Sequence, residues 1–143
     1  MNHWSKVLER DLPQIALELR DELEIPALVL LSGSVGAGKT TFAKSFMPQN
    51  SVQSPTYSIV HEIDNCVHAD LYRLKDASEL IHLELPLYLE DKDYFLVEWG
   101  KEYWKQLKKI VGDDFHYYEL VITTEELLNG ESARNYQLLR LDV

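Results

Sequence analysis

Residues 33–40 of this chain read GSVGAGKT, and this segment constrains the fold more strongly than any other. The segment has the spacing of the Walker A pattern, which is set by its first and last glycines, its lysine and its threonine. In this pattern the glycines let backbone N–H groups curve around a phosphate. The apolar run 27–31 before the loop predicts a buried strand, and the pattern after it predicts a helix over 39–47. Strand, loop and helix therefore follow one another in the order that a phosphate-binding loop requires.

Each residue of this loop is a candidate contact for the phosphates of a nucleotide. Lys39 is expected to reach the β- and γ-phosphates, and Thr40 to offer its hydroxyl to Mg²⁺. ATP is favoured over GTP because the sequence contains no Asn-Lys-x-Asp run. The predicted cofactors are therefore ATP and Mg²⁺. The nucleotide-binding residues predicted in this segment are Gly33, Ser34, Val35, Gly36, Ala37, Gly38, Lys39, Thr40 and Thr41.

The rest of the chain alternates between strand and helix patterns. Apolar alternation and turn signals predict strands over 4–8, 57–63, 66–71, 94–97, 116–123 and 136–141. Helical spacing predicts one helix capped by Asp11 and ended by Pro26, and others over 76–85, 86–90 and 101–111. The polar segment 124–135 is expected to separate the last two strands. The predicted fold class is α/β, a three-layer P-loop NTPase fold over 1–143 whose mostly parallel central sheet carries antiparallel additions.

Charge and cysteine content limit the function classes. The 143 residues carry a net charge of −10, which opposes the direct binding of nucleic acid by this chain alone. The lysines between 101 and 109 are accordingly expected to form a solvated helix face. A lone cysteine, Cys66, excludes an intrachain disulfide, and the longest apolar run is far too short to span a membrane. A cytoplasmic protein without membrane contact is predicted.

Three residues outside the loop are candidates for catalysis. Glu98 follows the apolar strand 94–97, where a carboxylate can serve Mg²⁺ or the attacking water; otherwise it is a surface residue at a loop start. Thr56 follows Pro55 where a loop could sense the γ-phosphate, although a simple turn into a strand also explains it. Asp70 could accept a hydrogen bond from water, or could be a turn residue; it shares a strand face with His68, and two residues do not make a zinc site.

Four segments together resemble the TsaE (YjeE) family of bacterial ATPases. They are GSVGAGKTT, SPTYSIVHE, HADLYRL followed by an acidic, leucine-containing helix, and LVEW, and they extend over nearly the whole chain. The family usually has Asp-Leu where this chain has Ser34-Val35, and the stretch before SPTY is shorter here. Neither difference removes a phosphate ligand.

The resemblance implies a Mg²⁺-dependent ATPase needed for threonylcarbamoyladenosine modification of tRNA. It implies that Lys39 and Thr40 contact phosphate and metal, that Glu98 binds the metal, and that Thr56 and Asp70 act in hydrolysis. It also implies that Arg134, in a segment similar to the family's C-terminal part, lies beside the nucleotide. The implied partners are the TsaD and TsaB proteins, whose complex is reset by ATP turnover and which hold the tRNA.

Two other functions use the same loop. A small-molecule kinase needs an acceptor pocket and usually a lid that carries arginines, and the five arginines of this chain are not clustered in sequence. A binding module without hydrolysis would use ATP only to order the segment 54–58 for a partner. Both remain alternatives to the ATPase.

Overall fold

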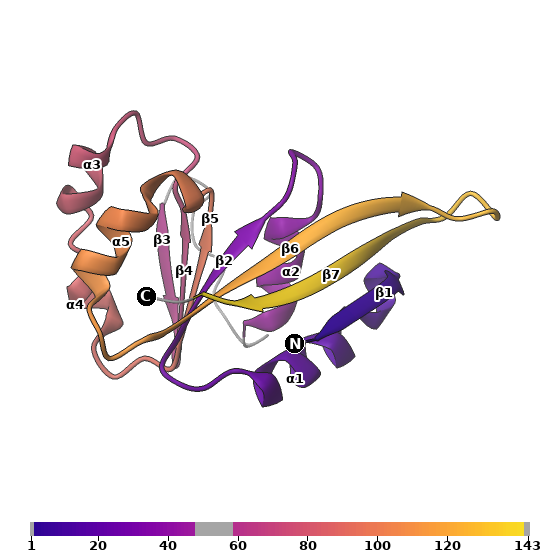
Figure 1. Ribbon diagram of the computed structural model, residues 1–143, viewed down its shortest axis with the longest axis horizontal. Helices are drawn as coiled ribbons and strands as arrows, with labels where there is room; N and C mark the ends of the chain where they lie inside the picture. Colours follow the sequence, from indigo (N-terminus) through magenta and orange to yellow (C-terminus); the bar gives the residue numbers. More distant parts are fainter. Residues whose placement is uncertain (1, 48–58, 142–143) are drawn as a thin grey trace.

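The computed structural model describes residues 2–47 and 59–141, and in these ranges seven strands form one sheet in the order β1-β7-β6-β2-β5-β4-β3. Helices cover both faces of this sheet (Figure 1). The α/β fold class with three layers is therefore confirmed.

The centre of the sheet is parallel. β2 (Ala27–Ser32) lies between β5 (Tyr94–Glu98) and β6 (His116–Glu126), and β4 (Cys66–Asp70) continues the parallel set beyond β5. Strands buried on both faces read as continuous apolar runs, as 27–31 does. Because these strands run the same way, their carboxyl ends meet at one edge of the sheet, where the loop 33–38 follows β2.

The antiparallel additions lie at the two sides of the sheet. β3 (Val60–Ile63) pairs with β4, β7 (Ser132–Arg140) pairs with β6, and β1 (His3–Val7) forms the edge beside β7. The predicted hairpin and the predicted N-terminal edge strand are thus confirmed. Residues 57 and 58 of the predicted first hairpin strand lie outside the described residues.

The prediction that 124–135 separates the last two strands was wrong. β6 continues to Glu126 and β7 begins at Ser132, so that Thr124 pairs with Arg134 and only a short turn remains. The two strands form a ribbon that reaches away from the layers (Figure 1). Water can reach such a ribbon from several sides, so its strands need not alternate apolar and polar residues. The hydrophobic pattern of the sequence therefore does not reveal these strands.

Two helices cover one face of the sheet. α1 (Leu12–Glu22), preceded by the 3-10 turn η1 (Glu9–Asp11), packs beside α2 (Lys39–Phe46). Their apolar side chains are buried against Tyr94 and Leu96 of β5. Asp11 does precede α1, but its carboxylate accepts from the N–H of Leu8, 3.0 Å away, and so caps the preceding turn instead of the helix.

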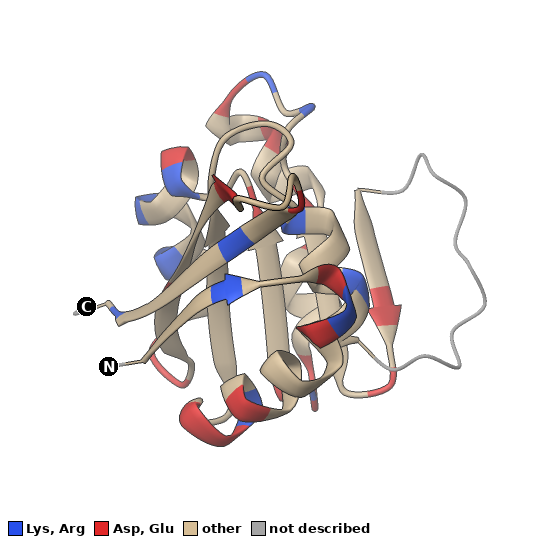
Figure 2. Cartoon of the chain, turned by 90° about the vertical axis from the view of Figure 1, so that its right-hand side faces the viewer, with Lys and Arg blue, Asp and Glu red and all other residues tan. Residues whose placement is uncertain are grey.

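The other face carries three short helices. They are α3 (Ala77–His82), α4 (Leu85–Leu89) and α5 (Trp104–Val111), the last preceded by the 3-10 turn η2 (Lys101–Tyr103). α5 buries Leu107 and leaves Lys105 and Lys109 exposed, and Lys and Arg segments recur along this helix in Figure 2. The predicted solvated helix face is therefore confirmed. Within the described part of the chain, no helix is both long and apolar enough to cross a membrane.

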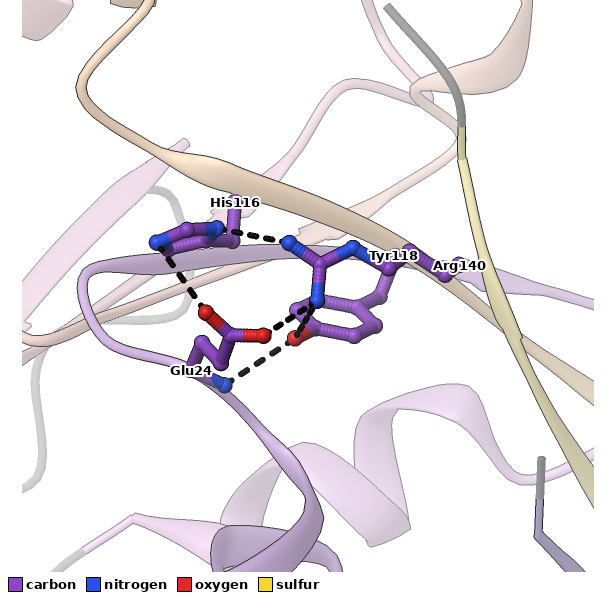
Figure 3. A network of polar contacts seen from close by, with 4 residues as sticks. All are labelled: Glu24, His116, Tyr118 and Arg140. Carbon is purple, nitrogen blue, oxygen red and sulfur yellow. Dashed lines mark hydrogen bonds and ion pairs between the residues drawn. The ribbon is translucent and has the colours of Figure 1, made fainter.

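A polar network ties the segment between α1 and β2 to the sheet (Figure 3). It lies at the start of β2, whereas the phosphate-binding loop follows the end of this strand. Arg140 donates to a carboxylate oxygen of Glu24 at 2.6 Å and to the hydroxyl of Tyr118 at 3.3 Å. The same hydroxyl accepts from the N–H of Glu24 at 3.0 Å, and His116 Nδ1 lies 2.8 Å from Arg140. These contacts fix the chain where it enters β2, the strand that leads into the loop.

Candidate nucleotide-binding site

The loop 33–38 joins β2 to α2 and forms one wall of a cavity of about 440 Å³. Gly36 and Gly38 adopt φ values of 85° and 100°, which glycine allows without steric cost. The cavity is lined by residues 35–41 and also by Asp70, Glu98 and Arg134. The structure therefore brings the predicted loop together with three candidate residues from distant parts of the sequence.

Lys39 is buried at the start of α2 and points back at the loop. Its Nζ donates to the carbonyl oxygens of Gly33 at 2.6 Å and Ser34 at 3.3 Å, and lies 3.8 Å from the centre of the Trp99 ring. Burial lowers the pKa of the Lys39 ammonium, while the nearby carboxylates of Glu98 and Asp70 oppose this shift. A buried cation held mainly by carbonyl dipoles and a ring face is suited to bind an anion that enters the cavity.

Glu98 and Thr40 lie in direct contact. The Thr40 hydroxyl donates to Glu98, with its oxygen 2.8 Å from Oε1 and 3.1 Å from Oε2. Glu98 ends β5 and is only 2% exposed, so it is not a surface residue at a loop start. A hydroxyl and a carboxylate are hard oxygen donors of the kind that Mg²⁺ takes, and here they lie beside the phosphate loop.

These donors fit a Mg²⁺ site that is completed by other oxygens. Among residues 2–47 and 59–141, no group of three or more His, Cys, Asp or Glu side chains is placed to hold a metal. Mg²⁺ usually binds through one or two protein ligands, phosphate oxygens and water, so a small protein donor set is what such a site needs. Thr40 and Glu98 are the residues that would hold the ion.

His68 contacts Glu98 from the neighbouring strand, an interaction that the sequence analysis missed. Its Nε2 lies 2.6 Å from Glu98 Oε2, and both side chains are almost fully buried. In the sequence, His68 is notable only for sharing a strand face with Asp70. The missing information is the register of β4 against β5, which pairs His68 with Leu96 and Asp70 with Glu98. His68 therefore lies diagonally across from Glu98 on the same face of the sheet.

Asp70 is a turn residue whose side chain also lines the cavity. Its Oδ1 accepts from the N–H of Tyr72 at 3.1 Å, which is the contact of a turn residue. Its side chain also lines the cavity, next to Glu98 in the strand register. The carboxylate therefore both shapes the turn after β4 and faces the space where a nucleotide would lie.

Arg134 reaches the loop from β7. Its Nε donates to the carbonyl oxygen of Ala37 at 2.7 Å, and one terminal nitrogen lies 3.4 Å from the carbonyl oxygen of Gly36. Val35, by contrast, is 77% exposed at the tip of the loop. Thr56, the third catalytic candidate, lies outside the described residues.

A second cavity of about 350 Å³ shares Lys39 and Trp99 with the lining of the first. Ser32, Lys39, Lys101 and Glu102 are among its lining residues. Lys39 is thus part of the wall of both cavities.

Comparison with known proteins identifies relatives for most of the chain. The family described as "Threonylcarbamoyl adenosine biosynthesis protein TsaE" matches residues 8–131. The tRNA threonylcarbamoyladenosine biosynthesis protein TsaE of Haemophilus influenzae is 36% identical over 97 residues, which are 62% of this chain and 60% of that protein. Its namesake from Bacillus subtilis is 40% identical over 81 residues, 51% of this chain and 50% of that protein. The matches thus span about half to three fifths of these relatives' length.

A solved structure is similar in fold. The crystal structure of YdiB from Bacillus subtilis superposes with a TM-score of 0.55 at 22% sequence identity, covering 94% of this chain and 83% of that one. At this identity the likeness supports the fold alone. It agrees with the layered α/β arrangement described above.

Proposed function

The chain belongs to the TsaE family, and on this basis we propose that it is a Mg²⁺-dependent ATPase that acts in the threonylcarbamoyladenosine modification of tRNA. One structural observation supports the Mg²⁺-dependent part of this proposal. The Thr40 hydroxyl at the end of the phosphate loop lies 2.8 Å from a carboxylate oxygen of the buried Glu98. This pair supplies the two protein oxygens that a nucleotide-bound Mg²⁺ needs in P-loop enzymes.

In the proposed reaction the protein binds and orients the nucleotide and neutralises the charge of its phosphates. Bound Mg²⁺ would neutralise charge on the phosphates. Backbone N–H groups of the loop 33–38 would hold the phosphates, and Lys39 would turn from the carbonyl oxygens of Gly33 and Ser34 towards them. Thr40 and Glu98 would hold the metal. Such preorganised positive groups stabilise the charge that develops during phosphoryl transfer.

Asp70, Thr56 and Arg134 have separate proposed roles. Asp70 lines the cavity, so its carboxylate can accept a hydrogen bond from the attacking water. Thr56 is proposed to sense the γ-phosphate, a role assigned from the sequence. Arg134 is proposed to lie beside the nucleotide, since its guanidinium already contacts the loop at Ala37 and Gly36.

The proposed partners are the TsaD and TsaB proteins, whose complex ATP turnover would reset. A net charge of −10 favours an arrangement in which those partners hold the tRNA. A cytoplasmic location belongs to the same proposal. Hydrolysis is expected to be slow in the isolated chain and faster with both partners.

The direct test measures phosphate release by the chain alone and with TsaD and TsaB. Lys39→Ala and Glu98→Ala should abolish the stimulated release, because one removes the phosphate cation and the other a metal ligand. Lys75→Ala and Glu90→Ala, at exposed positions, are the matched controls and should leave the rate unchanged. Equal turnover by the wild type and both site variants would overturn the proposal.

A small-molecule kinase is the second candidate, favoured by the cavity of about 350 Å³ that adjoins Lys39. Incubation with labelled ATP and a mixture of metabolites separates the two functions. A labelled metabolite would support the kinase, and labelled phosphate alone the ATPase. If Asp70→Asn stopped hydrolysis but left ATP-dependent partner binding and complex turnover intact, ATP would serve only as a gate for binding.

A further inference from the structure

We propose that His68 is a positioning residue for Glu98. Its hydrogen bond determines which oxygen of the Glu98 carboxylate faces Thr40 and the metal. The inference rests on the proposed function in one respect, namely that Glu98 serves a nucleotide-bound Mg²⁺. It goes beyond that function because it assigns a role to a histidine that lies outside the cavity lining.

The contacts of Glu98 distinguish its two oxygens. Oε2 lies 2.6 Å from His68 Nε2, whereas Oε1 makes the shorter of the two contacts with the Thr40 hydroxyl, at 2.8 Å against 3.1 Å. An ionised carboxylate only accepts hydrogen bonds, so Nε2 of His68 must carry the proton of this bond. The bond directs Oε2 towards β4 and leaves Oε1 for the side of Thr40.

The fold holds the His68 ring in place. His68 follows Cys66 by two residues on β4, and Glu98 follows Leu96 by two residues on β5, so all four side chains lie on the face covered by α2. On the other side, His61 of β3 is the cross-strand partner of His68, with ring centres 6.1 Å apart and planes at 19°. A polar row thus runs from β3 through β4 and β5 to α2.

Burial makes this bond important for the carboxylate. Glu98 is 2% exposed, so water cannot replace a lost hydrogen-bond donor. Among the described residues, loss of the His68 side chain would leave Oε2 with only the 3.1 Å contact to Thr40. The carboxylate could then rotate about its terminal bond, because this torsion has broad minima. A rotated carboxylate would present a different oxygen geometry to the metal.

The contribution of Mg²⁺ to nucleotide binding tests this role without measuring hydrolysis. The affinity for a fluorescent ADP analogue is measured in Mg²⁺ and in EDTA for the wild type, His68→Leu, His68→Gln and the exposed control His82→Gln. His68→Leu should reduce the gain in affinity from Mg²⁺ by about 10-fold or more, which is typical for loss of a hydrogen-bond partner of a metal ligand. Its affinity in EDTA should stay near that of the wild type, because the loop is unchanged.

His68→Gln should retain most of the gain, because its amide N–H can reach the position of Nε2–H. His68→Asn has the same amide on a shorter side chain, so it should resemble His68→Leu. This pair keeps the proposal testable if the leucine variant does not fold, since both variants are polar. Thermal unfolding without nucleotide shows which variants are folded.

An unchanged gain from Mg²⁺ in folded His68→Leu or His68→Asn would overturn the proposal. So would an equal loss of affinity in Mg²⁺ and in EDTA, because that pattern indicates a purely structural histidine. The absence of partner-stimulated phosphate release, with the expected Mg²⁺ pattern in all variants, would contradict the ATPase but leave this inference standing. Binding that does not depend on Mg²⁺ in the wild type would contradict both.

Discussion

Gly33→Ala is expected to damage both the stability of the protein and its nucleotide site, because there is no space for a methyl group at this position. A Cβ on Gly33 would lie 2.7 Å from the carbonyl oxygen of Ile122 and 2.9 Å from the Cβ of Ala37. Neither neighbour can move easily, since Ile122 is paired with Tyr136 in the sheet and both it and Ala37 are 1% exposed. The loop must therefore shift away from β6.

The expected loss of stability follows from the cost of adding atoms to a closely packed site. Adding a methyl group to a closely packed site costs about 1–3 kcal/mol. For a chain of this size that corresponds to a fall in Tm of roughly 3–10 °C. A shifted loop also misdirects its N–H donors, and the loss of one charge-assisted hydrogen bond of about 1.5–3 kcal/mol corresponds to a roughly 10- to 150-fold weaker nucleotide affinity.

Differential scanning calorimetry and nucleotide titration measure the two effects. Gly130→Ala is the matched control, since Gly130 lies in the turn of the ribbon with a φ of 86° and no atom within 4 Å of an added Cβ. Its left-handed backbone should cost about 1–2 kcal/mol of stability and leave the nucleotide affinity unchanged. Wild-type Tm and affinity in Gly33→Ala would refute the packing argument.

Two further predictions concern the polar contacts of Arg134 and of Glu24. Arg134→Ala should weaken nucleotide binding by about 10-fold, because it removes the donors to Ala37 and Gly36; an unchanged titration curve would contradict this. The second prediction concerns Glu24, whose hydrogen bond with Arg140 holds the pKa of the Glu24 carboxyl group below its ordinary value of 4.5. The folded state therefore binds fewer protons at this group than the unfolded state, and the hydrogen bond stabilises the fold at pH values above 4.5. This contribution is lost as the pH falls through the lowered pKa. Glu24→Gln should therefore have a lower Tm than the wild type at pH about 6, and the difference should shrink as the pH falls below 4.5. A constant difference, or an equal effect of the exposed control Glu22→Gln, would contradict this prediction.

The parts of the fold that the sequence predicts best are those encoded by neighbouring residues. Strand, loop and helix around Gly33–Thr40 could be predicted because the glycines, the lysine and the apolar strand are contiguous in the sequence. The buried strand that ends at Glu98 could be predicted for the same reason. The family resemblance implies that Glu98 and Thr40 both bind the metal, and the structure brings the two side chains together at 2.8 Å.

Features that depend on pairing between distant strands could not be predicted in this way. The contact of His68 with Glu98 requires β4 and β5 to be parallel neighbours in one particular register. The extension of β6 and β7 through 124–135 was missed because a two-stranded ribbon in water has no apolar face to mark its period. The contacts of Lys39 and Arg134 with backbone carbonyl oxygens depend on the conformation of the loop. Residue types alone do not predict this conformation.

The central claim is that the loop and Glu98 form one site for a Mg²⁺-bound nucleotide. Isothermal titration with ATP in the presence of Mg²⁺ tests it most directly, using the wild type, Lys39→Ala and the exposed control Lys75→Ala. We expect one binding site in the wild type and in Lys75→Ala, and no measurable binding in Lys39→Ala. Equal binding by the wild type and Lys39→Ala, or no binding by the wild type, would contradict the claim.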